Sequence, residues 1–259
     1  MRKFTLITGA SSGLGLDYAT EYAKANENLI LIARRIDRLE TIKADLLAKY
    51  PIEVLIYRVD LSDQKQTDQF LDQIPKDIFV VRLINNAGFG HHDAFEDYPN
   101  EVVSGMIEVN VLALTRLAHY FIPKMKAAQE GEILNVASMA AFTPGPFMAE
   151  YYATKAYVVS FSMALHEELK PFKIKVSALC PGPTHTEFGQ AAKYKHHDGI
   201  QSKVSMASLP VVKMSIKALK QNKKIAVPGF TNKILKVLMS IIPLSISSKV
   251  ISRIQKQRF

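Results

Sequence analysis

The chain has 259 residues, of which 48% are hydrophobic and 22% are charged. This is long enough for a buried core and too apolar for an intrinsically disordered protein. The single cysteine, Cys180, excludes an intrachain disulfide and favours a reducing compartment. The first residues lack the apolar core of a signal peptide, so we expect a cytoplasmic location.

The net charge of +9 is concentrated at the C-terminal end of the chain. Residues 199–259 contain twelve Lys or Arg and no Asp or Glu, whereas residues 1–198 contain 21 basic and 24 acidic side chains. Such asymmetry is typical of a region that meets an anionic ligand or surface. A solvated basic face also explains it, and we prefer that interpretation at this point. We expect no nucleic-acid partner.

Apolar runs rich in branched residues alternate with stretches of helical length. The runs are mostly continuous, as expected for strands that are buried on both faces of a parallel sheet. The alternation predicts an α/β fold: a Rossmann-like, doubly wound parallel sheet of about seven strands with helices on both faces. In such sheets ligands bind at the carboxyl ends of the strands. The predicted strands are 4–8, 29–33, 54–57, 80–84, 133–136, 174–179 and 225–227, and the clearest predicted helices are 14–26, 38–50 and 100–128.

A loop with three glycines follows the first predicted strand and opens the first predicted helix. Glycines let the backbone turn tightly and approach a pyrophosphate closely. The helix N-terminus then offers free N–H groups and the positive end of a dipole to that anion. The sequence therefore predicts a dinucleotide site. The residues predicted to form it are Gly9, Ser11, Ser12, Gly13, Leu14 and Gly15.

Two arginines, Arg34 and Arg35, end the second predicted strand. Enzymes that use NAD place an acidic residue at this position, on the ribose 2′-hydroxyl. An acid would repel a 2′-phosphate, whereas a guanidinium binds it through charge-assisted hydrogen bonds. Although Asp37 follows shortly after, the arginine pair favours NADP(H) over NAD(H).

Further short motifs follow the later predicted strands in order. A serine comes after the fifth strand, a tyrosine follows it by 13 residues, and a lysine stands four residues after the tyrosine. Together with the glycine loop, these motifs resemble the short-chain dehydrogenase/reductase family over about the first 190 residues. The matching residues are Asp60, Leu61, Asn85, Asn86, Ala87, Gly88, Asn110, Ser138, Tyr151, Lys155, Pro181 and Gly182.

The resemblance implies where the cofactor lies. In the family, the acidic residue after the third strand lies beside the adenine, and the segment after the sixth strand contacts the carboxamide and the phosphates. The lysine also holds the nicotinamide ribose. Besides the glycine loop and the arginines, the implied cofactor residues are Asp60, Leu61, Asn86, Ala87, Gly88, Lys155, Pro181, Gly182, Thr184 and Thr186.

The implied catalytic residues are Asn110, Ser138, Tyr151 and Lys155, and their chemistry is consistent with hydride transfer. Reduction of a ketone builds negative charge on its oxygen, so a proton donor must lie beside it. The pKa of a free tyrosine is about 10, and the charge of a lysine on the same helical face lowers it. Tyr151 would be the acid in reduction, Ser138 would donate a hydrogen bond to the substrate oxygen, and Asn110 would position a relay water. Tyr152, with Ala156 four residues on, is interpreted as a packing residue or part of the pocket wall.

Residues 189–208 are predicted to form a mobile substrate lid that excludes water. The adjacent histidine pairs His91-His92 and His196-His197 do not make a zinc site, which needs three or four ligands. We therefore expect no metal and place these histidines at the pocket rim or the surface. Cys180 is expected to be buried and inert.

Residues 231–259 are predicted to extend a single catalytic domain, residues 1–230, as two basic amphipathic helices broken near Pro243. The longest run without a charge, residues 237–248, is too short for a membrane span of roughly 20 residues. We rank packing or a lid over the pocket first, contact with a second subunit second, and an anionic membrane surface third.

The leading hypothesis is an NADP(H)-dependent carbonyl reductase with a lipophilic ketone or alcohol as substrate. The lipophilic substrate is inferred from the apolar tail and from the residues Phe142, Pro144, Pro146, Phe147 and Met148. A 3-oxoacyl reductase that receives an acidic acyl carrier on its basic tail is the alternative enzyme. A nucleotide-sensing or scaffold protein on the same fold is the non-enzyme alternative, and the complete catalytic set argues against it. The family resemblance implies a homodimer or homotetramer.

Overall fold

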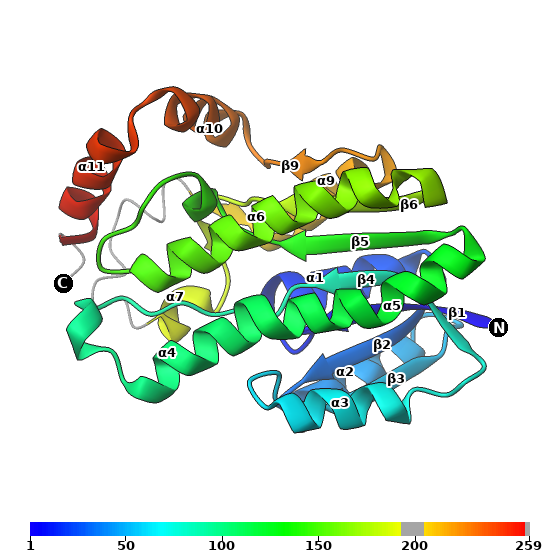
Figure 1. Ribbon diagram of the computed structural model, residues 1–259. Coiled ribbons are helices and arrows are strands. Elements are labelled where there is room, and N and C mark those ends of the chain that lie inside the picture. The colour runs from blue at the N-terminus through cyan, green and yellow to red at the C-terminus, as the bar shows by residue number, and fades with distance from the viewer. Residues whose placement is uncertain (193–204, 257–259) are drawn as a thin grey trace.

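A seven-stranded parallel sheet forms the centre of the computed structural model, which describes residues 1–192 and 205–256 (Figure 1). The strand order is β3-β2-β1-β4-β5-β6-β9, so the order reverses between β1 and β4. A crevice for a ligand is expected at the carboxyl ends of these two strands. The doubly wound sheet and its seven predicted strands are confirmed. The strands are β1 Arg2–Thr8, β2 Asn28–Ala33, β3 Val54–Arg58, β4 Ile78–Asn85, β5 Gly131–Val136, β6 Ile174–Leu179 and β9 Ile225–Ala226.

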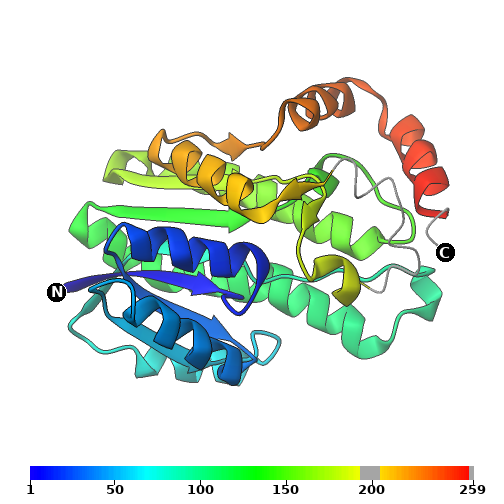
Figure 2. The ribbon, with the colours of Figure 1, turned by 180° about the vertical axis from the view of Figure 1, so that it is seen from behind.

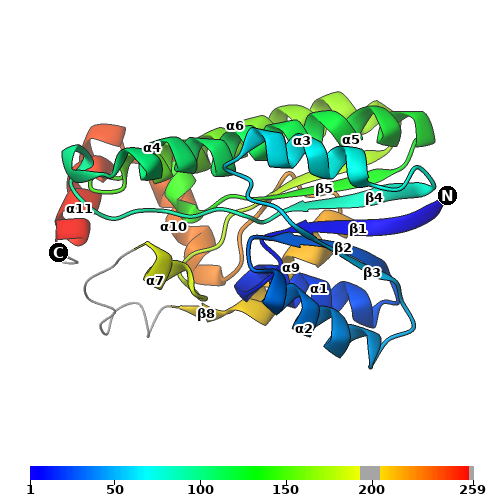
Figure 3. The same cartoon turned by 90° about the horizontal axis from the view of Figure 1, so that it is seen from below.

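Helices cover both faces of the sheet, which is why the strands are apolar throughout. Seen edge-on, α3, α4, α5 and α6 lie on one face and α1, α2 and α9 on the other (Figure 3). Successive residues of a strand point to opposite faces, and in β2 Ile30 and Ile32 pack in one core while Leu29 and Leu31 pack in the other. The helices are α1 Gly13–Lys24, α2 Ile36–Leu47, α3 Gln64–Gln73, α4 Asn100–Ile107, α5 Leu114–Ala128, α6 Ala149–Leu169, α7 Phe188–Ala191, α9 Ser208–Lys220, α10 Phe230–Ile241 and α11 Leu244–Lys256.

The predicted helix 100–128 is continuous but contains an irregular turn. A π-helical segment, Glu108–Ala113, joins α4 to α5 and carries Asn110. Such segments often occur at functional sites. By length and hydropathy the whole helix could cross a bilayer. However, Leu117 and Phe121 are buried in the core on one face of the sheet, so this helix packs as a core helix.

The C-terminal extension consists of two helices, as predicted, with Pro243 between them. From behind, α10 and α11 lie at one edge of the molecule, beyond β9 (Figure 2). The predicted lid is described only at its two ends, because residues 193–204 lie outside the described part of the chain. Near those ends, β7 (Thr184–His185), just before the predicted lid, pairs in parallel with β8 (Met206–Ala207), inside it. The division of the chain at residue 230 stays a prediction.

Arg82 of β4 is a buried cation that connects neighbouring elements. Its side chain is 10% exposed, its Nε donates to Glu132 Oε2 at 2.7 Å, and its Nη1 donates to Thr5 Oγ1 at 2.9 Å. It also pairs with Glu27, and its guanidinium lies 4.4 Å from the centroid of the Tyr22 ring. Burial alone would raise the pKa of Glu132, but the charges and hydrogen bonds of Arg82 and, to a smaller extent, Lys175 together outweigh burial and lower it.

We expect Arg82→Met to lower the free energy of unfolding by about 3 kcal/mol, because it removes the buried cation that the half-buried carboxylates of Glu27 and Glu132 share. Urea denaturation measures this loss. The pKa of Glu132 is lowered in the folded state, so its stabilising effect is present at neutral pH and is lost as the pH falls through that value. The difference between the two proteins should therefore shrink in acid.

The matched control is Arg116→Met. Arg116 is 36% exposed and lies 3.6 Å from Asp68, so its removal should cost less than about 1 kcal/mol. Equal losses for the two variants would contradict the role assigned to Arg82.

Candidate active site

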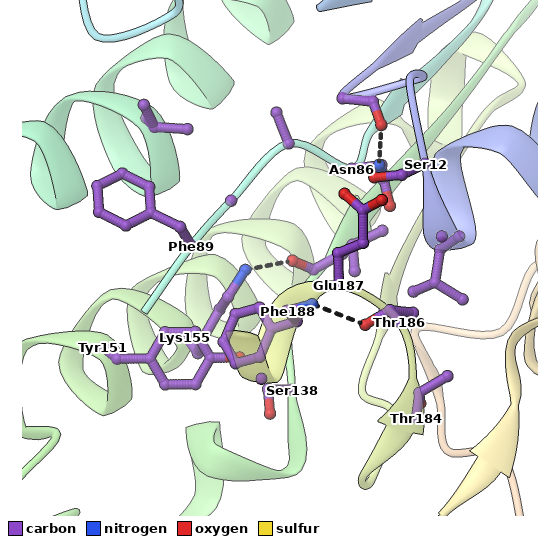
Figure 4. A pocket seen from close by; sticks show the side chains of 18 of the residues that line it. Ser12, Asn86, Phe89, Ser138, Tyr151, Lys155, Thr184, Thr186, Glu187 and Phe188 are labelled. Atoms are coloured by element: carbon purple, nitrogen blue, oxygen red, sulfur yellow. Dashed lines mark hydrogen bonds between the residues drawn. The ribbon is translucent and has the colours of Figure 1, made fainter. Parts of the chain in front are cut away.

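A cavity of about 870 Å³ lies at the carboxyl ends of the strands, where the strand order reverses. Among the predicted site residues, only Gly15 and Asn110 do not line it. Figure 4 shows the side chains that converge there from the glycine loop, β4, β5, α6 and the segment after β6 (Figure 4). The predicted residues that line the cavity are Gly9, Ser11, Ser12, Gly13, Leu14, Arg34, Arg35, Asp60, Leu61, Asn86, Ala87, Gly88, Ser138, Tyr151, Lys155, Pro181, Gly182, Thr184 and Thr186.

The glycine loop has a conformation that requires its glycines. Gly9 and Gly13 have φ angles of +63° and +53°, in the left-handed region that favours glycine. Gly15 lies behind the loop, and a Cβ atom there would come within 2.2 Å of the Gly9 carbonyl oxygen. The side chain of Ser12 does not cap α1, so the first N–H groups of that helix are left for a ligand. These features fit the pyrophosphate of a dinucleotide.

The segment Asn86–Gly88 is tied to the glycine loop by hydrogen bonds. The Thr8 hydroxyl accepts from the backbone N–H groups of Asn86 and Ala87 at 2.9 and 2.8 Å. The Asn86 side chain donates back to the carbonyl oxygens of Thr8 and Gly9 at 2.9 and 3.2 Å. These hydrogen bonds therefore fix the position of the glycine loop relative to the segment Asn86–Gly88.

A cationic cluster lies where β2 ends. Arg34 is exposed at the cavity edge, while Arg35 donates to the hydroxyls of Ser11 and Ser12 at 3.0 Å. Glu187 spans the cluster, because its carboxylate pairs with Arg38 at 2.6 Å and with Arg35 at 2.8 Å. Hydrogen bonds from Arg38 and Arg35 lower the pKa of Glu187 to about 2, so it carries its charge at neutral pH.

The predicted catalytic side chains Ser138, Tyr151 and Lys155 lie together at the other end of the cavity (Figure 4). Lys155 is buried, its Nζ donates to the Val136 carbonyl at 2.8 Å, and it lies 5.7 Å from the centroid of the Tyr151 ring. Burial lowers the pKa of Lys155 to about 8. The Ser138 oxygen accepts from the backbone N–H of Ala140 at 3.1 Å, which leaves its hydroxyl proton for another acceptor.

Asn110 does not face the cavity. Its side chain is buried, donates to the Phe89 carbonyl at 2.9 Å and to Thr154 Oγ1 at 3.1 Å, and accepts from the Phe89 N–H at 3.1 Å. Gly88 fits between Asn110 and Lys155, since a Cβ atom there would lie 2.9 Å from Asn110 Oδ1 and 3.2 Å from Lys155 Nζ. Asn110 thus fixes the Phe89 backbone beside the site, and its role with a relay water stays a prediction.

Apolar side chains form the rest of the cavity wall. Tyr152 is part of that wall, as predicted, and its hydroxyl accepts from Gln255 Nε2 at 3.1 Å. The Phe188 ring lies 5.2 Å from the Tyr151 ring and closes the site from the segment after β6. The apolar and aromatic lining residues around this end are Phe89, Val102, Val109, Met139, Met148, Tyr152 and Phe188.

Of the apolar residues between Ser138 and Tyr151 from which a lipophilic substrate was inferred, Met148 lines the cavity. Phe142, Pro144, Pro146 and Phe147 do not line the cavity. The rings of Phe142 and Phe147 lie instead 5.5 and 5.8 Å from the Nζ atoms of Lys236 and Lys256. These aromatics contact the C-terminal helices, a contact that local sequence does not reveal.

The histidine and cysteine predictions have different outcomes. His91 and His92 are buried rather than at the surface: the His91 ring lies 4.7 Å from that of Tyr98, and His92 Nε2 lies 3.2 Å from the Gln255 carbonyl. Within residues 1–192 and 205–256, no three His, Cys, Asp or Glu cluster as metal ligands. His196 and His197 lie outside the described residues. Cys180 is fully buried, and burial raises its pKa to about 12, as expected for an inert thiol.

The sequence analysis missed Arg38, Glu187, Phe188 and Gln255. Arg38 could have been found, because it follows Arg35 by one helical turn. Glu187 contacts Arg38, 149 residues earlier in the sequence, and Gln255 contacts Tyr152, 103 residues earlier. No local sequence pattern predicts contacts over such separations.

This fold and site define an oxidoreductase that works with a dinucleotide. A family model described as short chain dehydrogenase matches residues 3–196, and the chain belongs to that family, whose members use NAD(P) and act on CH–OH or C=O groups.

Several proteins are similar to this chain. An NADP-dependent 3-hydroxy acid dehydrogenase from Schizosaccharomyces pombe is 36% identical over 72% of this chain and 73% of its own length. A very-long-chain 3-oxoacyl-CoA reductase from Laccaria bicolor is 33% identical over 68% of this chain. The chain spans only about half of the length of such long relatives, 53% in this case. A short-chain dehydrogenase from Sphingobium yanoikuyae, solved in complex with NADPH, has a TM-score of 0.80 at 30% identity, covering 94% of this chain and 97% of its own.

We expect Gly15→Ala to weaken NADPH and NADH binding alike, each by at least about tenfold, because the added methyl group must displace the Gly9 carbonyl. Fluorescence titration of the purified protein measures both affinities. Gly105→Ala is the control, since a Cβ atom there meets only the Phe89 ring at 3.5 Å, an ordinary contact. Unchanged affinities in Gly15→Ala would show that the loop does not need this glycine.

Proposed function

We propose that the chain is an NADP(H)-dependent carbonyl reductase that acts on a lipophilic ketone or, in reverse, on the corresponding alcohol. The observation that carries the proposal is one continuous cavity with arginines at one end and Ser138, Tyr151 and Lys155 at the other. The NADPH complex of the Sphingobium yanoikuyae enzyme and the name of the Schizosaccharomyces pombe relative support the choice of cofactor.

The residues present fit this cofactor. The left-handed glycines and the uncapped end of α1 would hold the pyrophosphate, and Arg34 and Arg35 would hold the 2′-phosphate. Asp60, Lys155 and Thr186 also line the cavity; Asp60 would contact the adenosine half of the cofactor, and Lys155 and Thr186 its nicotinamide half. When bound, NADPH supplies the hydride that the carbonyl carbon accepts.

The side chains of the protein supply the proton and stabilise the charge. Tyr151 would donate a proton to the substrate oxygen, and Ser138 would donate a hydrogen bond to the same oxygen. The Ser138 hydroxyl proton is available for this bond because the Ser138 oxygen only accepts from the Ala140 N–H. Lys155 has a lowered pKa of about 8 but still carries its charge at neutral pH. That charge favours the phenolate of Tyr151 and makes the phenol a better acid.

A lipophilic substrate is supported by the apolar wall that Phe89, Met148 and Phe188 form beside Tyr151. A 3-oxoacyl thioester is the second candidate, favoured by the name of the Laccaria bicolor relative. The basic C-terminal region would then contact the acidic carrier of the acyl chain. Turnover of a panel of plain ketones and 3-oxoacyl thioesters with NADPH separates the two.

We further propose that the protein is a homo-oligomer. Leu112, Tyr157 and Met163 are each about 40% exposed on the helices that cover one face of the sheet. A second subunit packed on them would remove this apolar surface from water.

We expect Tyr151→Phe to reduce kcat by at least about a hundredfold, because the proton donor is lost. Affinity for NADPH should stay within about twofold of wild type, since the lost hydroxyl acts on the substrate oxygen. Steady-state rates and cofactor titration measure the two quantities. Tyr152→Phe is the control and should retain the chemistry; wild-type turnover in Tyr151→Phe would exclude the mechanism.

Charge changes in the cationic cluster should shift cofactor preference in opposite directions. Arg34→Ala should weaken the binding of NADPH by at least about tenfold and leave the affinity for NADH nearly unchanged, because only NADPH carries the 2′-phosphate. Glu187→Gln should tighten the binding of NADPH by about two- to fivefold, because the carboxylate no longer competes with the 2′-phosphate for Arg35 and Arg38. Calorimetry with both cofactors measures the shifts.

Glu40→Gln is the control for the second change, since it removes an exposed carboxylate from the same helix, α2. Equal losses of NADPH and NADH in Arg34→Ala would show that Arg34 does not contact the 2′-phosphate. Failure of wild type to bind either cofactor would favour the scaffold alternative.

A further inference from the structure

The C-terminal helices turn their apolar residues away from the protein. On α10, Phe230, Ile234, Val237 and Ile241 follow one another at helical spacing, and the first and last are 78% and 74% exposed. On α11, Ile246, Val250 and Ile254 recur every fourth residue and are all exposed. Ile242 and Leu244 continue the exposed surface through the turn between the helices. We call this surface the C-terminal apolar face.

The sides of these helices that face the protein are polar. Asn232 of α10 is 7% exposed, donates to the Pro228 carbonyl at 2.7 Å, and packs against Gly182, where a Cβ atom would lie 2.6 Å from its Oδ1. Gln255 of α11 is 2% exposed and donates to Tyr152. A helix that covers a core normally buries its apolar stripe. Here the arrangement is reversed, so packing against the pocket does not account for the apolar stripes.

Cations accompany the C-terminal apolar face. Lys233 on α10 and Lys249 and Arg253 on α11 are exposed, and none of them pairs with an acid in the part of the chain that the structure describes. No Asp or Glu occurs anywhere in residues 199–259. The face therefore combines a large apolar area with positive charge and offers no negative charge to a partner.

We propose that the C-terminal apolar face docks on the surface of a lipid bilayer that contains anionic lipids. Amphipathic helices with an apolar stripe beside Lys and Arg lie in the interface of such membranes. A second copy of the chain fits less well, because a symmetric contact would bring these cations against copies of themselves without an acid from residues 199–259 to pair with.

This docking goes beyond the proposed reaction and does not depend on it. The same helices touch two walls of the cavity, through Asn232 at Gly182 and through Gln255 at Tyr152. A bilayer on the outer side of α10 and α11, which lie at one edge of the molecule (Figures 1 and 2), would therefore be separated from the cavity by these helices.

The test is co-sedimentation of the purified full chain with two kinds of vesicle: phosphatidylcholine alone, and phosphatidylcholine with about 30% phosphatidylglycerol. We expect binding to the mixed vesicles, weaker binding to phosphatidylcholine alone, and weakening by salt. Ile241→Glu should abolish binding. Lys249→Gln with Arg253→Gln should lower partitioning by about fivefold for each charge removed.

Two variants with the same chemical changes elsewhere serve as controls. Leu47→Glu replaces an exposed aliphatic residue at the end of α2, and Lys217→Gln with Lys220→Gln removes two charges from α9. Both should bind like wild type, with thermal melting confirming that every variant is folded. The proposal is overturned if wild type ignores the mixed vesicles at low salt, or if Ile241→Glu binds as well as Leu47→Glu. It is also overturned if the wild-type protein is an oligomer that does not bind vesicles and Ile241→Glu dissociates that oligomer.

Discussion

The hydrogen bonds of the Thr8 hydroxyl hold together the two halves of the crevice on which the site depends. Thr8 ends β1, and Asn86 and Ala87 follow β4, the two strands between which the order of the sheet reverses. A doubly wound sheet leaves a gap at this point, because its connections diverge to opposite faces. The Thr8 bonds fix the width of that gap, and Gly15, packed on the Gly9 carbonyl, fixes the position of the helix behind it.

Charge is arranged differently at the two ends of the cavity. The end of the cavity that carries Tyr151 buries one cation, Lys155, whose ammonium donates to a main-chain carbonyl and lies near the Tyr151 ring. The other end exposes several arginines to water, and Glu187 bridges two of them. Burial makes the first charge sensitive to its surroundings, whereas the exposed cluster can exchange one anion for another at little cost.

The sequence was sufficient for the sheet and for most of the site because both depend on local patterns. A strand buried on both faces must be apolar throughout, and most of the motifs follow such a strand within a few residues, whereas Tyr151 and Lys155 lie on a helix. Asn110 was identified in the right helix, but the orientation of its side chain toward Phe89 depends on a π-helical turn that no residue pattern specifies. Phe142 and Phe147 suggested a lipophilic substrate, yet their rings lie beside lysines about a hundred residues later, a contact that no local pattern predicts. The same holds for His92, which is buried by the far end of the chain.

The contact of Gln255 with Tyr152 has a consequence for how such a protein can diversify. One wall of the substrate cavity is supported by α11, an element that contributes nothing to the glycine loop or to the Tyr151–Lys155 pair. Selection can therefore vary α11 and reshape the pocket while the reaction chemistry stays under separate constraint. In evolutionary terms, a substitution on α11 could reshape this wall of the cavity while Tyr151 and Lys155 stay the same.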